Sequence, residues 1–245
     1  MQRETRFGPC FHVSGPGAAG QGEIGARGRA LIDGGTSQEK QSGLCPGGEV
    51  ATKRTLSTRC ESILDYQAVM DAIYTRGWVI VDDFLTASEV DALRACLPGE
   101  WQPAGIGREG LHQGNPEIRR DQIHWLDPSL GAPVADYLAR MESLRQSVNQ
   151  ALYLGLHDLE AHLAVYPPGS FYQAHLDRFR DSDLRTLTVV LYLNPPDWQD
   201  EDGGHLRFWP ADWEGDSLLL QPAGGTLVTF LSDRFWHAVE PAGRT

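Results

Sequence analysis

The stretch that decides the fold is VYPPGSFYQAHLD, residues 165–177. It closes on a histidine and an aspartate two positions apart, His175 and Asp177. Side chains at i and i+2 of a strand leave the same face, so one strand can aim both groups at one point. A second imidazole comes from His237, inside the strand-like run 235–239. Two histidines and a carboxylate form the facial ligand set of non-haem Fe(II), which leaves three positions open. The sequence therefore predicts a metal site of His175, Asp177 and His237.

The spacing of His175 and Asp177 alone is a weak signal, because a surface turn can hold the same pair. The surrounding motifs strengthen it: Tyr166 and Gly169 lie before the pair, YLN (192–194) and GGHLR (203–207) follow, and LSDRFWHAVEP (231–241) carries the second histidine. In this order they resemble the Fe(II)/2-oxoglutarate-dependent dioxygenases, and within them the prolyl-hydroxylase branch. The resemblance covers about residues 65–245 and includes an Arg-x-Asp-x-Ile-x-Trp run at 119–125.

This resemblance implies a fold and a reaction. The fold would be a double-stranded β-helix, the jelly roll of cupins and of these oxygenases. The reaction would hydroxylate a prolyl or similar residue of a protein or peptide, using Fe(II), 2-oxoglutarate and dioxygen and releasing succinate and CO2. Ascorbate is a further candidate cofactor on the same resemblance.

The resemblance also implies roles for residues around the metal. Tyr192 would donate a hydrogen bond to the far carboxylate of 2-oxoglutarate, with Tyr166 and Thr188 lining the same pocket. Arg185 lies where the family places an arginine near the substrate entrance, and we expect a catalytic role for it. The alternative for the two tyrosines is plain aromatic packing with a satisfied hydroxyl.

The end of the sequence departs from the family pattern. The arginine that pairs with 2-oxoglutarate normally follows the distal histidine by nine positions, which would be position 246, and the sequence ends at Thr245. Arg244 is the one cation left to take this role, and the last strand of the roll is expected to be missing. A catalytically impaired, truncated metal-binding remnant is therefore the alternative to an enzyme. A cupin-like enzyme with another reaction is a third reading, which the YLN and GG motifs disfavour.

Composition divides the chain into three parts. Residues 1–60 hold twelve of the 27 glycines and two of the 22 aromatic residues. Such a segment buries too little apolar surface to offset its ordering entropy, so we expect a disordered leader. Residues 61–158 should form helices and a strand that pack on the roll, and residues 159–245 should form the jelly-roll core. Arg27-Gly28-Arg29 allows a regulatory or RNA-contacting tail, but the favoured interpretation is a leader without a function tied to the fold.

Hydrophobic periodicity predicts a mostly β fold with flanking helices. A helix is expected over 63–74, a strand over 78–81, a second helix after a capping box at 86–89, and a long amphipathic helix over 133–156. From residue 159 on, short β-branched and apolar runs alternate with Gly, Pro and Asp turns, as in a double-sheet roll. These strands are expected at 160–166, 171–175, 186–193, 205–209, 218–220 and 225–231.

Charge and hydropathy limit the partners. The net charge of -12 argues against nucleic-acid binding, which needs a basic surface. No apolar run has the length of a membrane span and no signal-peptide pattern opens the sequence, so we expect a cytoplasmic protein without a membrane partner. The four cysteines show no metal-site or disulfide spacing. His124 is expected to be structural, because the three metal ligands are found elsewhere.

Overall fold

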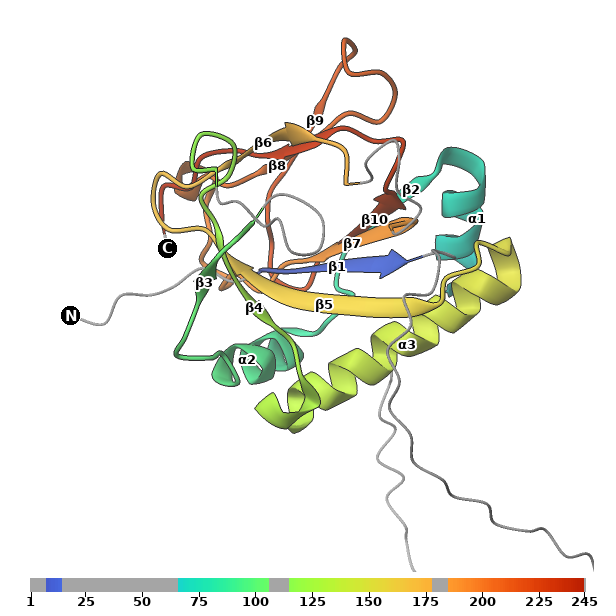
Figure 1. The fold of residues 1–245 in the computed structure, drawn as a ribbon, viewed down its shortest axis with the longest axis horizontal. Coiled ribbons are helices and arrows are strands. Elements are labelled where there is room, and N and C mark those ends of the chain that lie inside the picture. The colour runs from blue at the N-terminus through green and yellow to red at the C-terminus, as the bar shows by residue number, and fades with distance from the viewer. Residues whose placement is uncertain (1–7, 15–65, 106–114, 178–184, 245) are drawn as a thin grey trace, which may run out of the picture. The chain divides into compact units, whose positions relative to one another are not determined.

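The computed structural model describes residues 8–14, 66–105, 115–177 and 185–244. Within these ranges, two antiparallel sheets are accompanied by three α-helices (Figure 1). The helices are α1 (Tyr66–Arg76), α2 (Ala87–Ala95) and α3 (Ala132–Leu152), with short 3-10 turns η1 (Pro128–Leu130) and η2 (Asp200–Asp202). The predicted mostly β architecture with flanking helices is confirmed. None of the described helices is long and apolar enough to cross a membrane.

The larger sheet has seven strands in the order β2-β10-β7-β1-β5-β4-β3. These strands are β1 (Gly8–Ser14), β2 (Trp78–Val81), β3 (Gln102–Pro103), β4 (Gln122–Trp125), β5 (Asp158–Val165), β7 (Leu187–Leu191) and β10 (Leu227–Leu231). The smaller sheet has the order β6-β11-β8-β9. Its strands are β6 (Tyr172–His175), β8 (Leu206–Phe208), β9 (Leu218–Leu220) and β11 (His237–Val239). In Figure 1, α3 runs below β5 while β6 and β8 lie on the opposite side.

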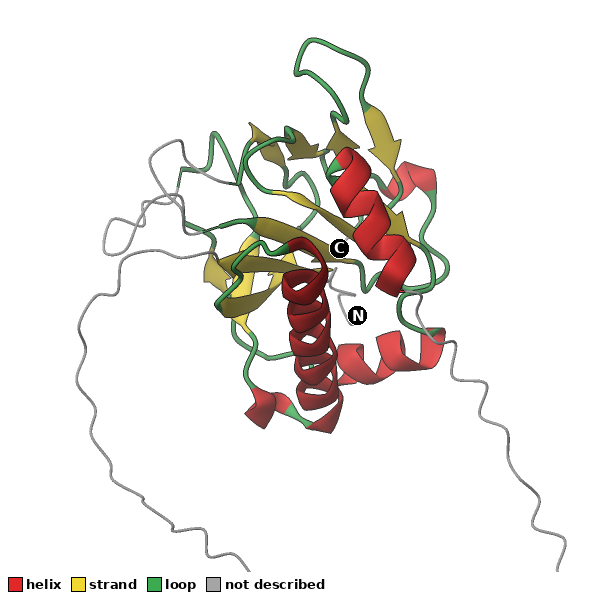
Figure 2. Cartoon of the chain, turned by 90° about the vertical axis from the view of Figure 1, so that its right-hand side faces the viewer, coloured by secondary structure: helices red, strands yellow, loops and turns green. Residues whose placement is uncertain are grey.

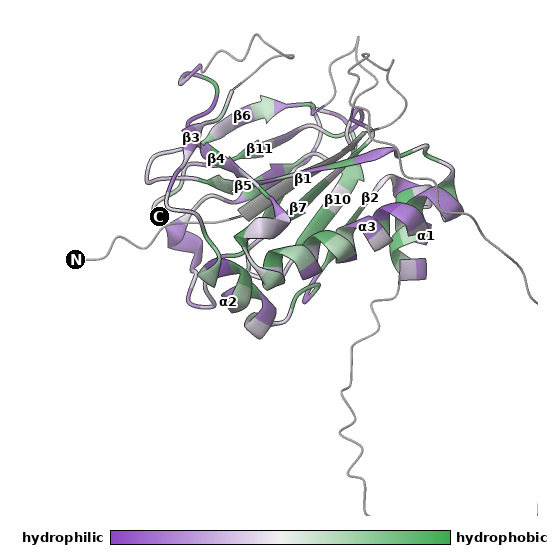
Figure 3. Ribbon diagram, turned by 60° about the horizontal axis from the view of Figure 1, so that its bottom comes forward, coloured by the Kyte–Doolittle hydropathy of each residue, from purple (hydrophilic) through white to green (hydrophobic). Residues whose placement is uncertain are grey.

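Strand β7 is buried on both faces because it lies between the helices and the smaller sheet. Leu187, Val189 and Leu191 join the core that includes residues of all three helices. Val190 belongs to a second core between the sheets, together with Phe208 of β8. Because successive side chains of a strand point to opposite faces, this one apolar run contributes side chains to both cores. Figure 2 shows the helices packed outside the sheets, and Figure 3 shows the hydrophobic character of neighbouring β10.

The helix ends follow local capping chemistry. The predicted capping box of α2 is present, with the Thr86 side chain accepting from the Glu89 backbone and the Glu89 side chain accepting from Thr86. The long helix was predicted to reach residue 156 but ends at Leu152. Tyr153 takes a left-handed conformation (φ 53°), which cannot continue a helix. The Asn149 side chain then caps the backbone of Leu156 at 2.7 Å in both directions.

The prediction of disorder over residues 1–60 is wrong for β1. This strand lies in the interior of the larger sheet, antiparallel to β5 on one side and to β7 on the other. Composition averaged over the segment missed it, because this short strand obtains its backbone hydrogen bonds from β5 and β7, which lie far away in the sequence. The rest of the predicted leader lies outside the described residues, and so does Arg27-Gly28-Arg29.

The glycine pair of the GGHLR motif has a backbone role. Gly203 has φ of +65°, and a Cβ there would lie 2.4 Å from the carbonyl oxygen of Pro241. It forms a bridge with Ala242, so the chain that follows β11 lies directly against this turn. Only glycine allows both the conformation and the close approach.

Candidate metal centre

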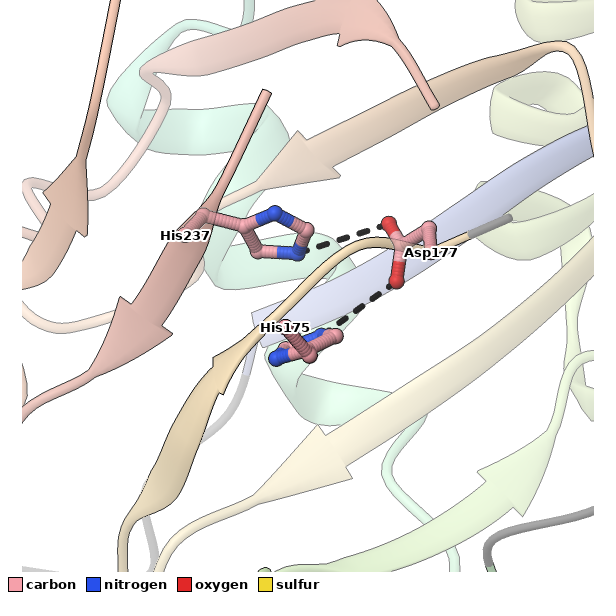
Figure 4. Close-up of side chains that lie close together, drawn as sticks. All are labelled: His175, Asp177 and His237. Carbon is pink, nitrogen blue, oxygen red and sulfur yellow. Dashed lines mark ion pairs between the residues drawn. The ribbon is translucent and has the colours of Figure 1, made fainter. Parts of the chain in front are cut away.

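The two histidines of the centre come from neighbouring strands. His175 is the last residue of β6 and His237 is the first residue of β11, and the two are direct cross-strand partners. Their ring centroids lie 4.2 Å apart. Asp177 follows two residues after His175 and faces both rings (Figure 4). One ligand atom from each of the three residues falls within 4.8 Å of the others, so the predicted set converges.

Backbone carbonyls orient both imidazoles. Nδ1 of His175 lies 2.7 Å from the carbonyl oxygen of Gln173, and Nδ1 of His237 lies 3.1 Å from that of Phe235. A carbonyl only accepts, so each Nδ1 carries the proton and each Nε2 keeps its lone pair. The Nε2 atoms lie 3.3 Å (His175) and 3.5 Å (His237) from the carboxylate oxygens of Asp177. Three donor atoms are thus directed at one point, as a metal requires.

Asp177 is held from the larger sheet. The Thr188 hydroxyl on β7 donates to its Oδ2 at 2.7 Å. Ser232 lies 2.8 Å from the same hydroxyl and is itself fully buried. A buried carboxylate needs compensating donors, and here a short hydroxyl chain supplies one. The acidic ligand is therefore fixed by the sheet that does not carry the histidines.

The protonation preferences of the two histidines differ. Burial lowers the pKa of His175, and the nearby His237 lowers it further. Burial also acts against the charged form of His237, but the charge of Asp177, the hydrogen bond to Asp177 and the hydrogen bond to the Phe235 carbonyl together outweigh it and raise the pKa. Together, a buried carboxylate faces two imidazoles, and its negative charge needs a compensating positive charge. A divalent first-row cation matches this need and the two-histidine, one-carboxylate donor set.

The residues expected around the metal are distributed over several elements. Thr188 reaches the centre directly through Asp177, as described. Tyr192 directly follows β7 and packs in the core between the sheets, with only 8% of its surface exposed. Tyr166 directly follows β5 and is partly buried. Arg185 lies just before β7 and is partly buried, and its charge acts on both His162 and Tyr172.

Arg244 has partners other than those expected. Its guanidinium lies 3.1 Å from the Asp197 carboxylate and 3.4 Å from that of Asp202. It also lies over the Trp198 ring, 5.5 Å from the centroid. These contacts hold the side chain on the loop between β7 and β8. A role in binding 2-oxoglutarate stays a prediction that this geometry does not favour.

Sequence reasoning gave no role to three residues beside the centre. The Tyr172 ring stacks on His175 with centroids 3.6 Å apart. Behind it lies Arg119, whose guanidinium forms a two-bond ion pair with the fully buried carboxylate of Asp121. Arg119 and Asp121 belong to the Arg-x-Asp-x-Ile-x-Trp run, which indicated the family but did not predict that these residues lie next to Tyr172. Tyr172 precedes His175 by three, a spacing that a regular strand would place on opposite faces.

Comparison with known proteins agrees with this centre. The model of the 2OG-Fe(II) oxygenase superfamily matches residues 161–245. A prolyl-4-hydroxylase from Pseudomonas putida is 46% identical, with a TM-score of 0.63 over 73% of this chain and 92% of that one. No curated protein matches the sequence significantly.

A more distant relative has the same fold. It is a prolyl hydroxylase from Trichoplax adhaerens, solved with a peptide fragment of the hypoxia inducible factor oxygen degradation domain. It is 29% identical, with a TM-score of 0.60 over 73% of this chain and 84% of that one. The two antiparallel sheets are the jelly roll of these enzymes, as predicted. Given the converging His175, Asp177 and His237, the chain belongs to the prolyl-4-hydroxylase-like 2OG-Fe(II) oxygenases, which are 2-oxoglutarate-dependent dioxygenases.

Proposed function

We propose that this dioxygenase hydroxylates a prolyl or similar residue of a protein or peptide. One substrate C–H bond becomes C–OH, while dioxygen and 2-oxoglutarate become that hydroxyl oxygen, succinate and CO2. The observation that carries the proposal is the three-residue centre, with both Nδ1 atoms occupied by carbonyls and Asp177 held by Thr188. The similarity to two prolyl hydroxylases supports the substrate class.

Different residues of this chain would bind the metal and the cosubstrate. His175, Asp177 and His237 would hold Fe(II), which when bound with 2-oxoglutarate supplies the oxidative chemistry. Tyr166, Thr188 and Tyr192 would line the cosubstrate pocket. Buried apolar walls from the core between the sheets would exclude bulk water there. Ascorbate would serve as the reductant that keeps the iron ferrous.

Arg185 would act on the substrate side. It lies just before β7, and its charge acts on Tyr172 and His162. A guanidinium offers several donors in a fixed plane, which suits the backbone carbonyls of an extended peptide. We therefore propose that Arg185 orients the peptide substrate.

The test is a peptide assay with a matched pair of substrates. Fe(II)-loaded protein is given 2-oxoglutarate and proline-containing peptides, or the same peptides with alanine in place of proline. We expect one added oxygen atom by mass spectrometry in the proline peptides alone, with stoichiometric succinate. His237→Ala should abolish both products. Succinate formed equally with either peptide would contradict a prolyl substrate.

A second candidate is a metal-binding protein without turnover. The pairing of Arg244 with Asp197 and Asp202 favours it, because this pairing occupies the cation expected for 2-oxoglutarate. Titration of 2-oxoglutarate into the metal-loaded protein separates the two. Saturable binding supports the enzyme, whereas metal binding without cosubstrate binding supports this alternative.

A further inference from the structure

Strand β6 contains an irregularity next to the metal centre. His175 pairs with His237, and Tyr172 pairs with Val239. Three steps along β6 therefore match two steps along β11, so β6 carries one extra residue. Such a bulge redirects a side chain across the sheet. On a regular strand Tyr172 and His175 would face opposite sides. Here their ring centroids lie 3.6 Å apart, and the two ring planes differ by 18°.

The other face of Tyr172 is covered by a buried cation. The Arg119 guanidinium lies 4.2 Å from the Tyr172 ring centroid. Asp121 binds it through two bonds of 2.7 and 2.5 Å and is itself fully buried. The backbone fixes the arrangement as well, because Arg119 forms a bridge with Tyr172. Arg119, Tyr172 and His175 thus form one column that ends at the metal centre.

Burial keeps Tyr172 neutral, although the nearby charge of Arg119 acts to lower the pKa of the phenol. Burial raises the pKa of Tyr172 to about 12, so its phenol stays protonated near neutral pH. A neutral aromatic face attracts the guanidinium on one side and packs on the imidazole on the other. The ion pair with Asp121 compensates the desolvation of the Arg119 charge.

His175 depends on such support more than its partner does. The His237 side chain is 6% exposed and packs on Phe230 with centroids 4.7 Å apart. The His175 side chain is 17% exposed, and its Nδ1 bond to Gln173 still lets the ring tilt about that bond. The face of Tyr172 removes this remaining freedom.

We propose that Tyr172, backed by Arg119 and Asp121, is a positioning residue that sets the plane of the His175 ring for metal binding. The bulge in β6 is the backbone feature that makes this possible. The proposal rests on the metal centre and is independent of the substrate proposed above. Tyr172 acts through His175 and needs no contact with the reacting atoms.

The test measures Co(II) binding to the metal-free protein by its visible ligand-field absorption. Tyr172→Leu should weaken Co(II) binding by about five- to tenfold, the scale of one aromatic pair, and should change the absorption band. Tyr172→Phe keeps the ring and should stay within about twofold of the starting protein with an unchanged band. Phe171→Leu is the matched control, because it removes the neighbouring arginine–aromatic contact with Arg120 without touching His175.

Two results would overturn the proposal. One is a folded Tyr172→Leu protein with unaltered affinity and spectrum. The other is a loss of affinity in Tyr172→Phe as large as in Tyr172→Leu, which would assign the effect to the hydroxyl. If Tyr172→Leu does not fold, the double variant Arg119→Met/Asp121→Leu decides, since replacing both charges by apolar groups avoids an unpaired charge. It should shift the Co(II) band, and an unchanged band would overturn the proposal.

The same titration separates this inference from failure of the proposed function. It uses the metal alone, so a wrong substrate leaves the result intact. A starting protein that binds no Co(II) would overturn the metal centre itself, together with this inference. Binding that is strong but indifferent to residue 172 would overturn the positioning role alone.

Discussion

The two sheets of the roll are buried to different degrees. The larger sheet is covered on one face by helices and on the other by the smaller sheet, and β7 is buried along its whole length. Among the described residues, the smaller sheet packs against the larger sheet on one face, and its edge strand β9 leaves Leu219 52% exposed. Yet the smaller sheet carries both histidines of the metal centre. The difference indicates that the larger sheet provides stability and fixes Asp177 through Thr188, while the smaller sheet presents the two histidines.

The largest expected loss of stability comes from a variant that creates a cavity between the sheets. Phe230 on β10 is fully buried and packs on Phe208 and His237. Phe230→Ala should lower the free energy of unfolding by about 3–5 kcal/mol, measured by urea denaturation. Leu219→Ala, on the exposed edge, should change it by less than about 0.5 kcal/mol. Equal losses would show that the two sheets contribute alike.

The next effect tests the interior position of β1. His12 pairs with Glu160 on one side and with Thr188 on the other. His12→Pro removes a backbone donor from a flanked strand, so the loss should be about 1–3 kcal/mol of unfolding free energy. His12→Ala keeps the donor and serves as the control. If the proline variant unfolds at the same urea concentration as the control, the sheet closes without β1.

A pH effect follows from His162 on β5. Burial, with the charges of Arg119 and Arg185 acting in the same direction, lowers its pKa from 6.5 to about 3. The folded protein therefore binds fewer protons than the unfolded chain below pH 6.5, and stability falls as the pH drops towards 3. The loss should reach about 2 kcal/mol near pH 5. His162→Phe should flatten this part of a pH–stability profile, and an unchanged slope would assign the acid sensitivity to other groups.

The link between the sheets can be tested at one hydroxyl. Thr188→Val removes the donor to Asp177, so Co(II) affinity should fall by about tenfold in equilibrium titration. Thr229→Val is a matched control, because Thr229 is equally buried but donates to the Thr188 carbonyl. Equal losses in both variants would indicate a general packing effect.

The smallest effect is expected at Arg244. Its ion pairs are partly exposed, with the Asp197 side chain 67% exposed. Arg244→Ala should therefore change the unfolding free energy by less than about 1 kcal/mol, less still at high salt. The same variant should bind 2-oxoglutarate as well as the starting protein does. Weaker cosubstrate binding would favour the role predicted from the sequence.

The features that were predictable from sequence depend on local chemistry. The capping box of α2 needs only Thr86 and Glu89, four residues of chain. The metal set was found from the i, i+2 spacing of His175 and Asp177 together with the family motifs around this pair and around His237, although Asp177 itself lies in a bend just after β6. The capping box is complete within a short segment, and the family motifs mark the metal set without knowledge of the packing.

The features that were missed depend on distant partners. Strand β1 forms by pairing with β5 and β7, and the composition of residues 1–60 carries no information about these distant partners. Tyr172 reaches His175 because β6 has one residue more than β11 opposite it, and a bulge has no signature in this stretch. The partners of Arg244 lie over forty residues away on a loop.

The interior position of β1 has a consequence for how the chain is made. A ribosome completes Gly8–Ser14 before any other described element, but its neighbours β5 and β7 emerge only after residues 158–191. During most of synthesis, β1 therefore has no neighbouring strand to pair with. The larger sheet is complete only when β1 pairs with β5 and β7, which closes a long loop of chain. Closing such a loop is an entropic cost that delays folding. We therefore expect the insertion of β1 to be a late and slow step of folding.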